Sequence, residues 1–165
     1  MENKLYVFHN SKQFGSPIGK PLLSIYKDGL RWIRHKNPKV DIAILPFQLN
    51  ANDKVSFVPD NLILEDLSEI HELIDVFYLS YQPGLHSFEQ DGCVNPTIRK
   101  GVISRMNNDG TFFIDGFAFP GNSGSPVFKF PNPIHYNQGG FSIGGPLDIK
   151  LIGVMGAYIP YEDVA

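Results

Sequence analysis

Short runs of alternating apolar and polar residues, separated by turn residues, occupy most of this chain. In the second half the alternation predicts strands near residues 76–81, 98–105, 111–115, 126–130 and 150–158. In the first half the runs are shorter, and we expect strands near residues 4–9, 20–26, 30–35 and 41–47. Asn108-Asp109-Gly110 stands between two of these runs and favours a hairpin turn. The pattern as a whole predicts an all-β protein.

Two segments depart from simple alternation. Within residues 51–75, four apolar residues approximate helical spacing and have acidic residues between them. This spacing predicts a short amphipathic turn or helix. The apolar residues are Leu64, Leu67, Ile70 and Ile74. Residues 131–149 are rich in Pro and Gly and are expected to form a long surface hairpin. Their glycine spacing does not match a phosphate-binding loop.

Composition narrows the class of protein. Hydrophobic residues make up 42% of the chain and charged residues 19%, while 16 Gly and 13 Pro favour many turns over long helices. A net charge of −3 argues against nucleic acid as the main partner. The five histidines show no paired spacing with Cys or acids, so no metal or other cofactor is expected. No apolar run has the length of a membrane span, and the single Cys93 cannot form an internal disulfide.

The hexapeptide Gly121-Asn122-Ser123-Gly124-Ser125-Pro126 holds the main candidate for chemistry. Its glycines let the backbone turn tightly, leave the Ser123 hydroxyl unshielded, and allow the amides of Gly121 and Ser123 to converge on one point. Paired amides of this kind stabilise the oxyanion that forms when a serine attacks a carbonyl. The nucleophile elbow of the α/β-hydrolases does not fit, because Pro126 disfavours the helix that must follow. A plain Gly/Asn/Ser turn without chemistry is the alternative.

A second motif, Asp41-Ile42-Ala43-Ile44-Leu45, places an aspartate at the start of an apolar strand, 82 residues before Ser123. Together the two motifs resemble the trypsin-like (chymotrypsin-fold) serine peptidases, in particular their cysteine-poor bacterial branch. The similarity is collinear from about Trp32 to Gly156. It includes the segments Trp32-x-x-His35-x-x-Pro38, Val76–Pro83 and Arg99–Ser104.

This resemblance implies a fold of two antiparallel β-barrels, here incomplete at both ends. Residues 1–50 would be the remnant of the first barrel, residues 51–75 the linker, and residues 76–165 the second barrel. The implied activity is hydrolysis of peptide bonds in a protein or peptide substrate by a Ser-His-Asp triad, without a cofactor. Such an enzyme would work in the bacterial cytoplasm or be exported without disulfides.

The resemblance also assigns roles to individual residues. Ser123 would be the nucleophile, Asp41 the residue that orients the histidine, and the amides of Gly121 and Ser123 the oxyanion hole. The apolar Phe117 would stand at the base of the specificity pocket, which argues against a preference for Lys or Arg. The segment beside the cleft that contacts the substrate would be Val154, Met155 and Gly156.

The histidine departs from the family pattern. The expected Thr-x-x-His segment before Asp41 is missing, and His35 is too close to the aspartate along one strand to fold back onto it. His9 has a workable separation but lacks the flanking Thr and Ala. We therefore expect the base upstream of Met1, with the chain a fragment that is inactive by itself. Two alternatives stay open: a protease-fold binding or regulatory module without catalysis, and a small all-β interaction domain with chance motifs.

Overall fold

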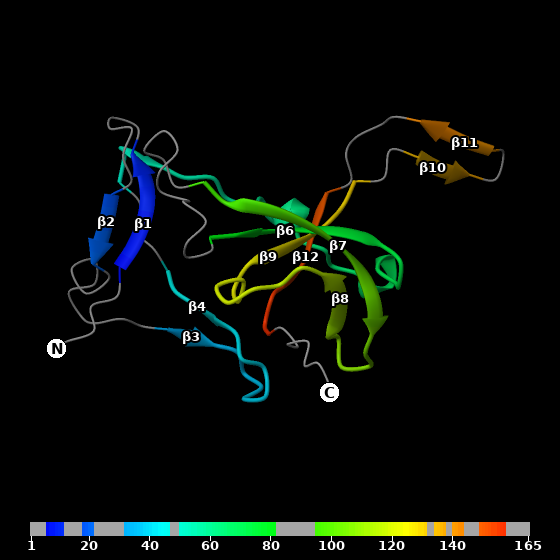
Figure 1. The fold of residues 1–165 in the computed structure, drawn as a ribbon, viewed down its shortest axis with the longest axis horizontal. Helices are drawn as coiled ribbons and strands as arrows, with labels where there is room; N and C mark the ends of the chain where they lie inside the picture. The colour runs from blue at the N-terminus through cyan, green and yellow to red at the C-terminus, as the bar shows by residue number, and fades with distance from the viewer. Residues whose placement is uncertain are drawn as a thin grey trace, which may run out of the picture. The chain divides into compact units, whose positions relative to one another are not determined.

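The computed structural model describes residues 6–11, 18–21, 32–46, 50–81, 95–131, 134–137, 140–143 and 149–157. Its described elements are strands joined by turns, with two single turns of 3-10 helix, so the protein is mostly β as the alternation predicted (Figure 1). The chain divides into two compact units. The first comprises residues 1–57 with 83–95, and the second comprises residues 58–82 with 96–165.

The first unit contains a three-stranded sheet and a hairpin. In the sheet, β1 (Tyr6–Ser11) lies between β2 (Ile18–Pro21) and β5 (Asp53–Lys54), and both pairings are antiparallel. The hairpin pairs β3 (Ile33–Arg34) with β4 (Ala43–Ile44). Each strand expected in this half has a counterpart here, although β4 is shorter than its apolar run suggested. Residues 22–26 of the second expected strand lie outside the described residues. The short β5 was not predicted.

The second unit is built on one antiparallel sheet in the order β12-β9-β6-β7-β8 (Figure 1). Its strands correspond to the five predicted runs; they are β6 (Asp75–Ser80), β7 (Thr97–Met106), β8 (Phe112–Gly116), β9 (Pro126–Lys129) and β12 (Lys150–Val154). The last strand was expected to reach residue 158, but β12 ends at Val154 and residues 155–157 are not in a strand. After β6, β7 and β8 have paired in sequence, β9 returns to the free side of β6. This arrangement is a Greek key.

The core of the second unit lies on one face of this sheet. Along β6 the even-numbered residues are buried and the odd-numbered ones are partly exposed, as the two-residue period of a strand requires. Residues from neighbouring strands and from the preceding loop complete this core. Its buried apolar members are Ile70, Val76, Tyr78, Ile103, Val127 and Ile152.

The connection between β7 and β8 is the predicted hairpin turn. Gly110 has a φ of +83°, which a residue without a side chain adopts readily, and Asp109 accepts hydrogen bonds from the amide and hydroxyl of Thr111. Further along the hairpin the register shifts between Ile103 and Arg105, so that one extra residue, Ser104, forms a bulge.

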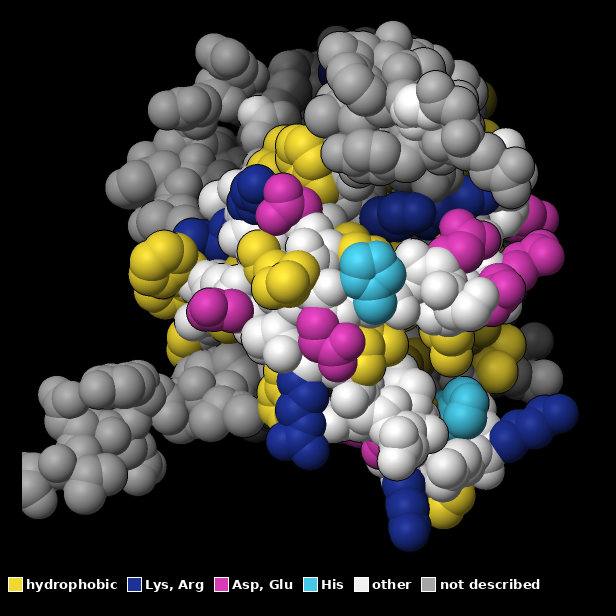
Figure 2. All heavy atoms as spheres, turned by 90° about the vertical axis from the view of Figure 1, so that its right-hand side faces the viewer, with side chains coloured by type: hydrophobic (Ala, Val, Ile, Leu, Met, Phe, Trp, Pro, Cys, Tyr) yellow, Lys and Arg dark blue, Asp and Glu magenta, His cyan; other side chains and the backbone are white. Residues whose placement is uncertain are grey.

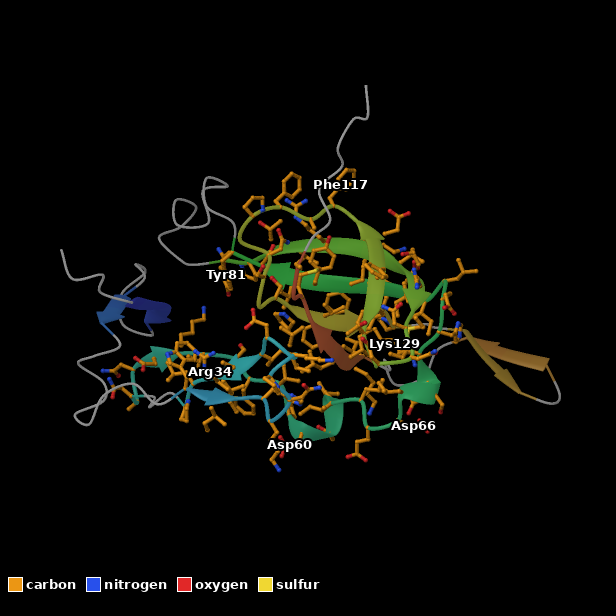
Figure 3. All side chains as sticks on the ribbon, turned by 90° about the horizontal axis from the view of Figure 1, so that it is seen from below. Arg34, Asp60, Asp66, Tyr81, Phe117 and Lys129 are labelled. Carbon is orange, nitrogen blue, oxygen red and sulfur yellow. The ribbon has the colours of Figure 1, made fainter. Side chains whose placement is uncertain are left out.

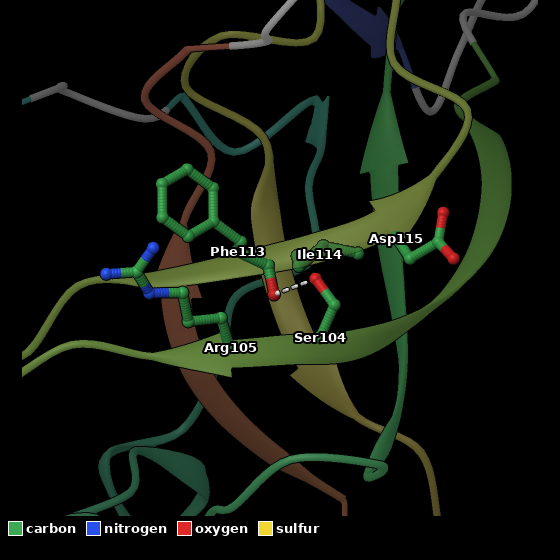
Figure 4. Close-up of a pocket in the computed structure, with 5 residues that line it drawn as sticks. All are labelled: Ser104, Arg105, Phe113, Ile114 and Asp115. Atoms are coloured by element: carbon green, nitrogen blue, oxygen red, sulfur yellow. Dashed lines mark hydrogen bonds between the residues drawn. The ribbon is translucent and has the colours of Figure 1, made fainter.

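Beside this bulge the surface of the β7–β8 hairpin is hollowed. The Ser104 hydroxyl donates to the carbonyl oxygen of Phe113 across the two strands at 3.3 Å (Figure 4). The open hollow is lined by Ser104, Arg105, Phe113, Ile114 and Asp115.

The segment before β6 forms two single 3-10 turns, η1 (Asp60–Leu62) and η2 (Leu67–Glu69), rather than one amphipathic helix. Between the two turns the chain leaves helical geometry because the Leu64 amide donates to the carbonyl of Leu151 in β12 at 3.0 Å. Asp66 then begins η2 by accepting a hydrogen bond from the Ser68 amide, which lowers the pKa of Asp66. The predicted short amphipathic turn is therefore present as two 3-10 turns, separated by a contact with the sheet.

The segment between β9 and β12 contains the hairpin expected within residues 131–149. It pairs β10 (Ile134–Asn137) with β11 (Gly140–Ile143) in antiparallel register. The face of the molecule drawn in Figure 2 shows acidic and basic side chains interspersed with hydrophobic ones. Charges of both signs are thus mixed on that face.

Candidate functional site

The predicted serine lies in the loop that joins β8 to β9, residues 117–125, which we call the crossover loop. Ser123 is exposed, whereas Asn122 beside it and Ser125 two residues further are buried. Gly121 and Gly124 have φ values of +97° and +84°, in the left-handed region that favours glycine. The two glycines thus fold the chain so that Ser123 faces solvent while Asn122 and Ser125 face inward.

Three of the amides in this turn are already used. The Asn122 amide donates to the carbonyl of Phe119 at 3.1 Å, and the Ser125 amide donates to the carbonyl of Asn122 at 3.0 Å. The amide of Gly124 donates outside the loop, at 2.8 Å. Within the described residues, the amides of Gly121 and Ser123 donate no hydrogen bond. These are the two amides that the sequence motif named as oxyanion donors.

Asn122 fixes the loop from inside. Its side chain is 2% exposed, and its Oδ1 accepts a hydrogen bond from the Phe119 amide at 2.9 Å. Because the Asn122 amide also donates to the Phe119 carbonyl, the two residues close a small ring of backbone and side chain. The residue before the candidate nucleophile is therefore a structural element of the loop.

The predicted substrate-binding segment lies next to the serine. The Met155 amide donates to the carbonyl of Ser125 at 2.9 Å, and the Met155 carbonyl accepts from the Gly124 amide at 2.8 Å. These bonds continue the pairing of Val154 with Pro126 past the end of β12. Val154 and Gly156 are exposed on either side of Met155, so this segment borders the crossover loop with part of its surface open.

Phe117 begins the crossover loop, and its side chain is 75% exposed, at the outer edge of the loop in Figure 3. Its carbonyl accepts a hydrogen bond from the hydroxyl of Tyr78, which lies in the core. Two residues further, the ring of Phe119 lies under the guanidinium of Arg99, 4.7 Å from its centroid. The described residues thus hold the backbone at position 117 and leave its side chain open.

Asp41 belongs to the first unit, so neither unit alone contains both predicted catalytic residues. It is exposed at the turn of the β3–β4 hairpin, next to Ile42, whose carbonyl accepts from the His35 amide at 3.0 Å. The Nδ1 atom of His35 accepts a hydrogen bond from the Asn37 amide at 3.1 Å, so this atom is bonded within the β3–β4 turn. His9 lies on β1, where the described structure is limited to the backbone.

No family model, curated protein or solved structure matches this chain.

Among the described residues, no group of three or more His, Cys, Asp and Glu side chains is placed to hold a metal ion. In the same part of the chain, no helix has the length and apolar character needed to cross a membrane.

Two side chains at the site were not singled out from the sequence. In the sequence Tyr78 and Arg99 look like ordinary strand residues. In the structure both contact the crossover loop. A partial signal exists for Tyr78, because a tyrosine at an inward-facing strand position needs a partner for its hydroxyl. Which residue provides that partner cannot be read from alternation, since Phe117 is 39 positions away.

Proposed function

We propose that this protein is a serine endopeptidase of the trypsin-like type, with Ser123 as its nucleophile. The observation that supports this best is the division of amides in the crossover loop. Those of Asn122, Gly124 and Ser125 are engaged in holding the loop, while those of Gly121 and Ser123 remain open within the described residues. Because Gly121 and Ser123 are exposed, these open amides are accessible to a ligand beside the exposed hydroxyl.

The proposed reaction is acyl transfer. The Ser123 Oγ forms a bond to the carbonyl carbon of the peptide, and its proton passes to a histidine. The amides of Gly121 and Ser123 stabilise the oxyanion, each contributing about 3–4 kcal/mol. As the C–N bond breaks, the histidine returns the proton to the leaving amine, and water then hydrolyses the acyl-enzyme by the same steps. In this proposal Asp41 orients the histidine and stabilises its charged form.

The finer fold proposed with this function is a pair of antiparallel β-barrels. Support comes from the Greek-key order of the second unit, in which β12 and β8 are the two edges of the sheet. A further strand between those edges would close the sheet into a barrel. The exposed Val154 and Gly156 beside the crossover loop provide backbone for an extended substrate to pair with.

A fluorophosphonate probe tests the proposal directly, because it labels only a serine whose hydroxyl is activated. We expect labelling that Ser123→Ala abolishes, while Ser125→Ala, which removes a buried hydroxyl from the same loop, retains it. The assay uses both residues 1–165 and a longer product that includes any residues encoded before Met1. Labelling of the longer product alone places the base before Met1, and labelling of both makes His9 the candidate.

The contrary result is equally informative. If neither product labels and neither hydrolyses casein, Ser123 is not a nucleophile. The remaining interpretation would then be a protease-fold module that binds peptides without cleaving them. A serine without its base loses nearly all of its rate enhancement, so the two interpretations differ by several orders of magnitude in the labelling rate.

A further inference from the structure

The ring of Tyr78 packs in the core of the second unit, while its hydroxyl forms a hydrogen bond with the crossover loop. The side chain points to the inner face of β6 and is 0% exposed, and its hydroxyl donates to the carbonyl of Phe117. Burial raises the pKa of this hydroxyl above its usual value, which outweighs the opposing effect of the nearby Arg99 charge. The hydroxyl therefore stays protonated at neutral pH and remains a hydrogen-bond donor.

The backbone near Phe117 is shaped to admit this hydroxyl. A Cβ atom added at Gly116 would lie 3.4 Å from the Tyr78 hydroxyl and 3.3 Å from the Cα of Gly101 on the neighbouring strand. Glycine at position 116 thus lets β8 approach both groups closely at the point where the crossover loop begins. Glycine at position 116 therefore leaves room for the hydrogen bond between the Tyr78 hydroxyl and the Phe117 carbonyl.

A second side chain, that of Arg99, contacts the crossover loop two residues after Phe117. Arg99 on β7 is the direct antiparallel partner of Tyr78, so both side chains point to the same face. The Arg99 guanidinium lies over the ring of Phe119. One cross-strand pair therefore contacts the loop at positions 117 and 119, and Asn122 closes it at its other end.

We infer that Tyr78 and Arg99 are positioning residues that set which apolar side chain the enzyme accepts at the cleaved residue. The inference rests on the proposed function. Phe117 presents an exposed ring from a backbone fixed by Tyr78, and the same backbone leads within four residues to the Gly121 amide. Loosening the first half of the crossover loop would let the Phe117 ring move relative to that amide, and the discrimination between large and small substrates would fall.

Hydrogen exchange of backbone amides tests whether Tyr78 holds the loop. The informative amides are those of Phe119 and Asn122, which bond within the loop. In Tyr78→Phe we expect these two amides to exchange about tenfold faster, because a hydrogen bond to the loop is lost. The amides of β6 should be unchanged. Ser80→Ala is the matched control, since it removes a hydroxyl from the same strand and face that has no partner among the described residues.

The ratio of kcat/KM for substrates with Phe and with Ala at the cleaved residue tests specificity, and this ratio does not depend on the folded fraction. We expect about a tenfold fall in the ratio for Tyr78→Phe, from a shift of ~1 Å or less in the loop. Arg99→Lys should lower it in the same direction, because an ammonium cannot stack as a planar guanidinium does. Ser80→Ala should leave it unchanged.

The outcomes separate this inference from the proposed function. If Ser123 labels but Tyr78→Phe leaves both the exchange of Phe119 and the substrate ratio unchanged, the inference is overturned and the peptidase stands. Faster exchange throughout β6 would show a loss of stability rather than of position, and would overturn it as well. If Ser123 does not label at all, the proposed function fails and the specificity inference fails with it.

Discussion

Phe119 and Asn122 are joined by two hydrogen bonds that run in opposite directions. The Asn122 amide donates to the Phe119 carbonyl, and the Phe119 amide donates to Oδ1 of Asn122. This pair closes the backbone immediately before Ser123 through two bonds that lie within the crossover loop. The shape of the loop around the serine is therefore set locally, and its place on the sheet is set by Tyr78 and Met155.

Replacing Asn122 with Ala should lower the free energy of unfolding by about 1–3 kcal/mol, because a buried acceptor is removed and the Phe119 amide loses its partner. Urea denaturation measures the change. Asn61→Ala, at an exposed position, is the control and should fall within about 0.5 kcal/mol of the unmodified protein. Equal stability of the two variants would show that the Phe119–Asn122 ring contributes nothing.

Gly124→Ala should destabilise the protein by about 1–2 kcal/mol through backbone strain alone. Its φ of +84° is unfavourable for a residue with a Cβ atom, while no heavy atom lies within 4 Å of the position that atom would take. Gly156→Ala is matched to it, since its Cβ would also meet nothing within 4 Å and its φ lies outside the left-handed region. A comparison of melting temperatures should show a loss for Gly124→Ala only.

Leu73 is the non-glycine residue with a positive φ, +70°, among the described residues, and its side chain is 84% exposed. Leu73→Asn should raise the free energy of unfolding, by up to about 1 kcal/mol, because Asn tolerates the left-handed region better than Leu. Leu73→Ala removes the same apolar surface without relieving the strain and is the control. The prediction is wrong if the two variants unfold at the same urea concentration.

Glu72 should make the protein sensitive to acid. Its carboxylate accepts a hydrogen bond from the Met106 amide at 2.9 Å, and this bond lowers the pKa of Glu72 below its usual 4.5. A lowered pKa gives stability that is present above pH 4.5 and is lost as the pH falls through the folded-state value. Denaturation at a series of pH values between 3 and 7 should therefore show a smaller loss for Glu72→Gln than for the unmodified protein.

The proposed peptidase should prefer small or apolar residues at the cleaved position. Phe117 provides no charge at the base of the proposed pocket, and burying an unpaired Lys or Arg there would cost several kcal/mol. Profiling with a peptide library measures the preference. Strong cleavage after Lys or Arg that disappears in Asp115→Asn would mean that this exposed carboxylate of β8 determines specificity in place of Phe117.

The strands of the second unit could be predicted because short runs of strand-forming residues, separated by turn residues, mark them in the sequence. Val76, Tyr78 and Ser80 are buried and alternate with partly exposed neighbours, so the two-residue period of a strand appears in their burial. β5 could not be predicted in this way, because its two residues, Asp53 and Lys54, form no apolar pattern. The division of the predicted amphipathic segment into two short turns depends on a hydrogen bond from Leu64 to Leu151, which no local spacing reveals.

The local part of the candidate site was also open to prediction. Glycines at 121 and 124 indicated the tight turn, and the structure gives both residues positive φ values. The contacts from Tyr78 and Arg99 were not predictable, because they join segments separated along the chain and depend on which strands become neighbours. The triad itself stays a prediction, since Asp41 and Ser123 belong to different units.

The Greek key has a consequence for how this protein reaches its folded state. The pairing of β6 with β9 joins residues such as Val76 and Lys129, and it forms only when the crossover loop closes over the preceding hairpin. Pairings between segments far apart in sequence cost chain entropy before they give contacts, and they slow folding. Closure of the loop that holds Ser123 is then part of the step that completes the sheet, so substitutions in this loop should alter the refolding rate.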